Sequence, residues 1–258
     1  MNFVVVGILL VLGLFIGTLC MLELGRRLGS RRMMLDPKGA RAGAGAVEGA
    51  VFGLMGLLIA FTFSGAATRF DIRRSQLVEE ANSIGTAWMR LDLLPPATQP
   101  SLREKFRGYT DARLEAFRKI PNLSAAQAEL DRASFLQGEI WREAVKSCSD
   151  AGTPAATILL LPALNQMFDM ATTRTMGTQM HPPLVIYLVL GLLLLVGALL
   201  AGYHMSEGKS RSWIHSLAFV GGIVLAFYVI LDVEFPRVGV IRIHGFDRVL
   251  VELRQSMK

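Results

Sequence analysis

Residues 48–83 decide the fold, and they read EGAVFGLMGLLIAFTFSGAATRFDIRRSQLVEEANS. Apart from Glu48, the first half is apolar and rich in glycine, whereas the second half mixes acids, bases and leucines at helical spacing. No proline interrupts the stretch, so one helix is expected to leave a lipid bilayer and continue into water. Such a helix of roughly 45 residues would be about 70 Å long and would hold the aqueous part of the protein rigidly to the span.

A helix that crosses the hydrocarbon of a bilayer needs about 20 apolar residues, and four stretches satisfy that length. They are residues 2–22, 47–67, 183–203 and 213–231. The chain has 258 residues and is 52% hydrophobic. Soluble domains usually have a lower hydrophobic fraction, because their surface must be polar. The first run lacks the basic start and the small-residue cleavage site of a signal peptide, so we expect it to remain as a span.

Basic residues between the runs predict the orientation, because short cytoplasmic loops carry an excess of Lys and Arg. Residues 23–45 contain six such side chains, and residues 204–212 contain two. Both segments are therefore expected on the cytoplasmic side of a bacterial inner membrane, in a multi-pass protein. The segment between the second and third spans would then be periplasmic, although Arg69, Arg73 and Arg74 reduce the asymmetry.

Residues 68–182 lack the alternation of strands and predict a bundle of three or four helices. The first of these continues from the second span and should end near Leu94, before Pro95. Along it, apolar residues recur at steps of four and three, as in helices that pack lengthwise against a neighbour. The residues of this seam are Leu77, Ala81, Ile84, Trp88 and Leu91.

Helix-start signals divide the rest of the bundle. Ser101 followed by Glu104 fits a capping box and predicts the start of the next helix. Ser124 is expected to cap the helix after that. A further helix should run from Pro154, with a kink or a break at Pro162.

The C-terminal tail has a different pattern. Residues 238–243 alternate apolar and polar side chains and include β-branched residues, which predicts a short strand followed by a short helix. The predicted fold class is an all-α membrane protein with four transmembrane helices, an extramembrane helical bundle between the second and third, and this short tail. Its segments are a first transmembrane pair with a basic loop (1–67), the extramembrane helical domain (68–182), a second transmembrane pair (183–232) and the tail (233–258).

Small side chains form a stripe along the second span. At 100° per residue they fall within an arc of about 100° on one helix face. The residues of the stripe are Gly45, Gly49, Gly53, Gly56, Ala60 and Ser64. Small residues let helix backbones approach closely in lipid, where the hydrophobic effect contributes little. The stripe therefore predicts either packing against another span of the same chain, or a subunit contact or pore-lining face in a homo-oligomer.

Polar side chains gather at the ends of three spans that the topology places at one membrane edge. They are Arg69, Asp71, Arg73, Arg74, Glu79, Glu80 and Asn82 after the second span, Asn165, Asp169, Arg174 and His181 before the third, and Asp232, Glu234 and Arg237 after the fourth. Such a cluster is typical of a salt-bridge network with headgroup contacts, or of the charged vestibule of an ion pathway. At the other edge, Glu48 is either a pore-mouth acid or an acid at a helix N-terminus among headgroups.

Motifs for other functions are missing from the sequence. The four histidines and two cysteines do not have metal-ligand spacing, and no Walker loop, dinucleotide-binding glycine motif or nucleophile elbow occurs. The net charge of +6 comes without a nucleic-acid recognition motif, so it fits membrane loops and headgroups better. We therefore expect no enzyme activity, no metal, no cofactor and no nucleic-acid partner.

Three blocks resemble the bacterial membrane family described as bestrophin-like, whose own activity is not established. They are EGAVFGLMGLLIAFTFSGAATRFDIRRSQLVEEANSIGTAWMRLDLLP (48–95), LPALNQMFDMATTRTMGTQMHPP (161–183) and LDVEFPRVGVIRIHG (231–245). The resemblance spans residues 10–255 and implies similarity to bestrophins, which are pentameric anion channels with four membrane helices and a helical domain between the second and third. Two features depart from that plan. The longest acidic run is Glu79-Glu80, too short for a calcium site, and the basic loops place the inter-span domain outside the cytoplasm.

Two functions therefore remain open at the level of sequence. The first is a homo-oligomeric, bestrophin-like ion channel in the lipid bilayer, with inorganic ions passing along the stripe. The second is a non-conducting membrane scaffold or sensor whose helical domain binds a partner.

Overall fold

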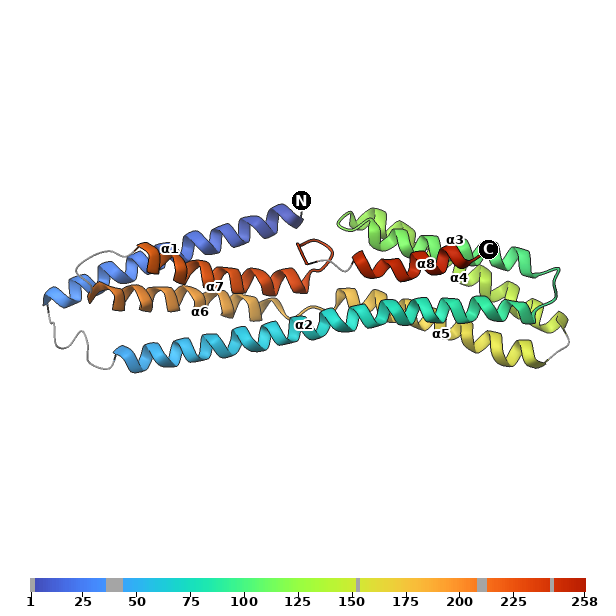
Figure 1. The fold of residues 1–258 in the computed structure, drawn as a ribbon, viewed down its shortest axis with the longest axis horizontal. Coiled ribbons are helices and arrows are strands. Elements are labelled where there is room, and N and C mark those ends of the chain that lie inside the picture. Colours follow the sequence, from blue (N-terminus) through green and yellow to red (C-terminus); the bar gives the residue numbers. More distant parts are fainter. Residues whose placement is uncertain (1–2, 36–43, 152–153, 208–212, 242–243) are drawn as a thin grey trace. The chain divides into compact units, whose positions relative to one another are not determined.

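The computed structural model describes residues 3–35, 44–151, 154–207, 213–241 and 244–258, and every regular element within these ranges is helical (Figure 1). The α-helices are α1 (Phe3–Leu35), α2 (Ala44–Arg90), α3 (Gln99–Arg118), α4 (Leu123–Ala151), α5 (Pro154–Gln179), α6 (Leu184–His204), α7 (Trp213–Glu234) and α8 (Arg248–Ser256). Short 3-10 turns are η1 (Leu91–Leu93), η2 (Met205–Glu207) and η3 (His244–Asp247). The predicted all-α class is confirmed.

The chain divides into two compact units. The spanning unit comprises residues 1–68 and 181–235, and the bundle unit comprises residues 69–180 and 236–258. Helix α2 is uninterrupted and contributes to both units. Four helical stretches are long and apolar enough to cross a membrane, as predicted. They are Val5–Leu35, Gly45–Leu93, Pro154–His204 and Trp213–Glu234.

Glycine lets α1 and α6 pack backbone to backbone in the spanning unit. A side chain added at Gly25 would collide with the carbonyl of Leu199, and one added at Gly202 would collide with the carbonyl of Leu22. Gly29 lies one turn beyond Gly25 and is equally crowded by α6 and the turn that follows it. This spacing of two glycines four residues apart is the pattern that permits close helix crossing in lipid.

The basic segment after the first run is helical, so the predicted basic loop is wrong over most of its length. Helix α1 continues to Leu35, and residues 36–43 lie outside the described residues. Glu23 pairs with Arg26 at 3.1 Å and with Arg27 at 3.0 Å, one turn further along the helix. These pairs support the helix beyond the apolar run.

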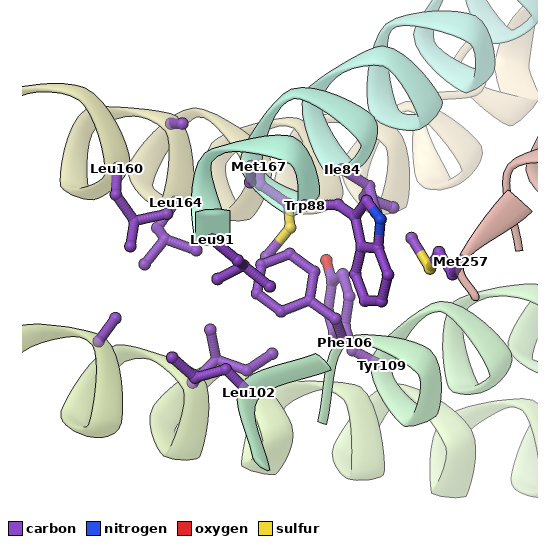
Figure 2. Packing of buried hydrophobic residues seen from close by; sticks show 14 of the residues in the cluster. Ile84, Trp88, Leu91, Leu102, Phe106, Tyr109, Leu160, Leu164, Met167 and Met257 are labelled. Atoms are coloured by element: carbon purple, nitrogen blue, oxygen red, sulfur yellow. The ribbon is translucent and has the colours of Figure 1, made fainter. Parts of the chain in front are cut away.

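The core of the bundle unit joins α2, α3, α4, α5 and the C-terminal tail (Figure 2). All five seam residues of α2 and η1 are buried, with Trp88 the most exposed at 9%, so the predicted seam is confirmed. Trp88 meets Phe106 of α3 edge to face, with 6.1 Å between the ring centroids. Met167 of α5 and Met257 after α8 belong to the same cluster.

The predicted helix caps are wrong in two places. Helix α3 begins at Gln99, two residues before Ser101, because a proline fits the first turn of a helix, where no amide hydrogen bond is lost. At the start of α4, Asn122 takes the capping role that we assigned to Ser124, since its Oδ1 accepts a hydrogen bond from the amide of Ala125 at 3.2 Å.

Of the two outcomes expected at Pro162, the break does not occur, because helix α5 runs through this residue without being split. The predicted strand near the C-terminus is wrong. Residues 238–241 form turns and bends in place of the predicted strand, and residues 242 and 243 lie outside the described residues. No strand occurs in the described ranges, so a strand here would have no partner for its backbone groups. The short helix expected after it is α8.

Candidate functional site

The stripe of small residues on α2 faces away from the rest of its own chain. Gly45, Gly49, Gly53, Gly56, Ala60 and Ser64 are all exposed. A side chain added at any of the four glycines would meet no atom within 4 Å in the described part of the chain. The stripe therefore does not pack on another described span of the same chain, and this face is available to a second copy or to a conduit.

A different face of α2 contacts the other helices of the spanning unit. Met55, Thr62 and Ala66 are buried there. Phe52 meets Phe219 of α7 edge to face, with 6.1 Å between the ring centroids. At 100° per residue, Met55, Thr62 and Ala66 lie about 110–150° from the centre of the stripe around the helix, and Phe52 lies about 70° from it.

Glu48 belongs to the face that contacts the chain's own helices. Its side chain is 11% exposed, and its Oε2 lies 3.5 Å from Nδ1 of His204 at the end of α6. An acid in the first turns of one helix beside a histidine in the last turn of another is favoured by both helix dipoles. Glu48 therefore joins α2 to α6 and does not share the surface of the stripe.

The predicted interfacial polar cluster separates into several small groups. In the bundle unit, Arg73 donates hydrogen bonds to the carbonyls of Gly177 and Met180 at 3.1 and 2.9 Å. Asp71 accepts from Arg74 at 3.1 Å on an exposed surface. The remaining positions on α2 and α5 are exposed, and they are Glu79, Asn82, Asn165 and Asp169, while Arg69 is half-buried.

Glu80 and Arg174 from that cluster meet at the centre of a buried ionic network. Glu80 is 0% exposed and accepts from Nε of Arg113 at 2.5 Å and from Nη1 of Arg174. Arg174 also faces Asp247 at 3.6 Å, and Asp247 accepts two hydrogen bonds from Arg237 at 2.7 and 2.9 Å. The network thus links α2, α3, α5 and the segment that leads to α8.

An aromatic ring completes this network. All three guanidinium groups lie near the ring of Phe117, with Arg174 closest at 3.8 Å from the centroid, and Arg113 and Arg237 at 5.2 and 5.3 Å. Such placement is favourable because the ring face is negative. Three guanidiniums and two carboxylates leave one net positive charge inside the bundle unit. No reacting group is present among them, so the arrangement is suited to holding helices together.

The pKa of Glu80 lies below its ordinary value. Burial by itself would raise this pKa, but the charges of Arg113 and Arg174 and the hydrogen bonds from them outweigh it. Glu80 therefore stays ionised, as the network requires.

Sequence reasoning missed three members of the network, namely Arg113, Phe117 and Asp247. A signal for the first was present, because Arg113 follows Phe106 and Tyr109 on the apolar face of α3. A charged residue on a buried helix face needs a partner of opposite charge. Glu80 fits that need, because it is an acid close to the buried seam of α2. Asp247 gives no such signal, because it lies at the junction of η3 and α8, outside any amphipathic face on which a charge would stand out.

The last part of the predicted cluster lies in the spanning unit. Glu234 is 0% exposed, and its Oε1 lies 2.9 Å from Nδ1 of His181. The imidazole stacks on Phe235 with 4.5 Å between the ring centroids. Asp232 accepts from the hydroxyl of Tyr228 at 3.1 Å. These acids are held by neighbours at the ends of α6 and α7.

The bundle unit also contains a cleft between α2 and α5, lined by both polar and apolar side chains. It has a volume of about 460 Å³, and its lining includes Glu79, Asn82, Thr86, Arg90 and Gln166. Two exposed members of the predicted cluster therefore share one concave surface. Within the described ranges, no three His, Cys, Asp or Glu side chains lie close enough together to hold a metal ion.

Comparisons with known proteins agree on the family. The family model described as bestrophin-like domain matches residues 42–244. Among solved structures, a bacterial bestrophin homologue from Klebsiella pneumoniae with a point mutation matches with a TM-score of 0.61 at 12% identity, over 93% of this chain and 98% of that chain. A second point mutant of a bacterial bestrophin homologue from the same organism matches with a TM-score of 0.64 at 12% identity, over 95% and 98%. No curated protein matches. Because the family model covers most of the sequence, the chain belongs to the bestrophin-like domain family.

Proposed function

We propose that the protein is an ion channel of a bacterial inner membrane, assembled as a homo-oligomer whose conduit is lined by the stripe of α2. Membership of the bestrophin-like domain family supports this function. The observation that carries it is the exposure of all six stripe residues, with open space beyond its four glycines. Small side chains on helices that surround an axis leave room for ions between the copies.

The surface of α2 beside the stripe, here called its flank, carries large apolar side chains that are exposed, which supports contact with lipid or with a neighbouring copy. Leu54 and Phe61 are 49% and 65% exposed. Large apolar side chains of this kind suit lipid or a neighbouring copy, whereas the glycines suit close approach or an aqueous path. The same helix therefore offers one surface for the axis and another for its surroundings.

Thiol modification during current recording tests the proposal. In a C20S background, G53C and S64C place thiols on the stripe, and F61C places a matched thiol on the flank; the remaining Cys148 is buried. The purified protein is reconstituted in planar bilayers, and a hydrophilic thiol reagent is added during conduction. We expect the current to fall for G53C and S64C and to persist for F61C. Equal block at all three positions, or none, contradicts pore lining by the stripe.

The orientation is part of the proposal, with the bundle unit on the periplasmic side. Its support is the basic character of the C-terminal end of α1, where Arg26, Arg27, Arg31 and Arg32 occur within two turns. A phosphatase fused after Lys258 reports on the side that holds the bundle unit, because the enzyme folds only in the periplasm. Full phosphatase activity is expected. An inactive phosphatase, together with activity of a cytoplasmic reporter fused at the same residue, contradicts the proposed orientation.

A non-conducting scaffold or sensor is the second function, and the cleft between α2 and α5 favours it. A concave surface of this size, where hydroxyl, amide and charged groups lie among apolar ones, is suited to bind a soluble partner or ligand. Conductance and mass together separate the two functions. Absence of current in every salt, with a monomeric mass in detergent, removes the channel and leaves the scaffold.

A further inference from the structure

A second concave surface lies in the spanning unit, between α1 and α7. The two helices lie side by side (Figure 1). The cleft between them has a volume of about 380 Å³. Leu19, Cys20 and Leu24 line it from α1, and Trp213 and Ser216 line it from the start of α7. Its walls are thus mainly apolar, and no described segment of the chain fills it.

One end of this cleft is charged, because Glu23 and Arg27 line it, and Arg31 lies one turn beyond Arg27 on α1. At 100° per residue, Cys20, Leu24, Arg27 and Arg31 fall within an arc of about 60° on α1. The first two are apolar, and the side chain of Arg27, which lines the cleft, is 72% exposed. Arg27 binds Glu23 through Nε, and within the described ranges Arg31 has no ion pair. The exposed face of α1 therefore changes from apolar to cationic at the cleft.

The local charge is strongly positive. The last four turns of α1 carry one acid, Glu23, and four arginines, which leaves a net charge of +3. Guanidinium groups bind phosphate oxygens in pairs, and they hold them in the geometry of a bidentate hydrogen bond. Trp213 lines the cleft and is the first residue of α7, and an indole at the end of a span favours the boundary between acyl chains and headgroups.

We propose that this cleft binds an anionic phospholipid, with an acyl chain against Leu19, Cys20 and Leu24 and the headgroup phosphate at Arg27 and Arg31. The combination of an apolar cleft on a membrane-spanning helix with a cationic end fits an amphipathic anion, and a lipid is the ligand that a bilayer supplies there. The proposal does not depend on conduction, because it concerns a face of α1 and not the stripe of α2.

Native mass spectrometry of the detergent-purified protein tests the site, with phosphatidylglycerol as the anionic probe and phosphatidylcholine as the zwitterionic one. We expect phosphatidylglycerol to bind, and R27Q and R31Q each to weaken its binding about fivefold. R32Q is the matched control, because it removes one charge at the same depth but about 100° further around the helix. It should change binding less than twofold. Equal effects of all three substitutions mean diffuse charge attraction and overturn the site.

The apolar half of the cleft needs its own test. C20W fills the cleft without changing charge, so it should lower phosphatidylglycerol binding while the thermal midpoint and the oligomer mass stay unchanged. Glycerophosphoglycerol, the same headgroup without acyl chains, should not compete. If the free headgroup competes as well as the lipid, the site is one for small phosphates and the proposal fails. If R27Q changes the oligomer mass and leaves lipid binding intact, a second copy occupies the cleft and the proposal fails in that way.

Discussion

Replacing Glu80 by glutamine tests the buried network of the bundle unit most directly. The side chain of Glu80 is 0% exposed, and the two arginines that bind it are each 4% exposed. Removing one partner from a buried ion pair costs about 3–5 kcal/mol, because a desolvated charge is left behind. Here two guanidiniums lose their shared carboxylate, and only Arg174 has another acid nearby, Asp247 at 3.6 Å. The expected loss therefore lies toward the upper end of that range.

Thermal unfolding in detergent measures this loss, followed by tryptophan fluorescence in a W213F background, so that the signal comes from Trp88 and Trp141 of the bundle unit. A destabilisation of about 4 kcal/mol corresponds to a fall of roughly 10–15 °C in the midpoint for a unit of this size. E79Q is the matched control, because Glu79 is exposed and its carboxylate accepts a hydrogen bond from the hydroxyl of Ser75 at 2.9 Å. It should shift the midpoint by no more than about 2 °C. An E80Q midpoint equal to that of E79Q would refute the role of the network.

The same pair of variants predicts a pH dependence with a definite sign. The pKa of Glu80 in the folded protein is lowered from its ordinary value of 4.5, so the folded state binds fewer protons at this group than the unfolded state. Its contribution is fully present above pH 4.5 and is lost as the pH falls toward the lower folded value. The stability difference between wild type and E80Q should therefore be constant near neutrality and shrink in acid. A difference that grows in acid contradicts the assignment.

Two further predictions concern packing and thiol reactivity. G202A should destabilise the spanning unit by about 1–3 kcal/mol, because a methyl group there meets the carbonyl of Leu22. G13A is the control and should not destabilise the unit, since a methyl group at Gly13 meets no atom within 4 Å. Thermal midpoints in detergent compare the two variants, and equal midpoints argue against the backbone contact. Burial raises the pKa of Cys148, so a C20S variant should react slowly with a maleimide at a pH where an ordinary thiol is labelled, and fast labelling would show that this part of the core is open.

The spans and the seam could be predicted because burial in each case imposes a period on the sequence. Leu77, Ala81 and Ile84 recur at helical steps because each must face the core of the bundle unit, and such spacing is visible without any structure. The end of α2 was similarly visible, since Pro95 cannot continue a helix. Local sequence is enough for these predictions, because the burial of a helix face and the end of a helix do not depend on which distant residues are in contact with it.

The failures share a physical cause, which is that the deciding contact lies far away in sequence. Gly25 was placed in a loop because arginines follow it, yet its partner is the backbone of α6, and long arginine side chains can extend from a helix end to water. The predicted strand near Val238 had β-branched residues but no second strand to pair with in the described ranges. Arg113 reaches Glu80, and Asp247 reaches Arg174, only because separate helices and the tail fold around them.

Exposed glycine in the stripe leads to a last prediction, in which two effects have opposite signs. Glycine in a helix costs about 0.5–1 kcal/mol relative to alanine, so G53A should stabilise α2 if Gly53 faces only lipid. If the stripe faces another copy, the added methyl group instead separates the helices, and G53L separates them further. G222A on α7 is the control, because Gly222 is exposed and has no atom within 4 Å of an added side chain. We expect the thermal midpoint to rise for G222A without a change in oligomer mass, and the oligomer to weaken progressively from G53A to G53L in analytical ultracentrifugation. Should both Gly53 variants behave like G222A, the stripe makes no subunit contact at Gly53, and block of the current in G53C is then the result that separates a conduit from lipid.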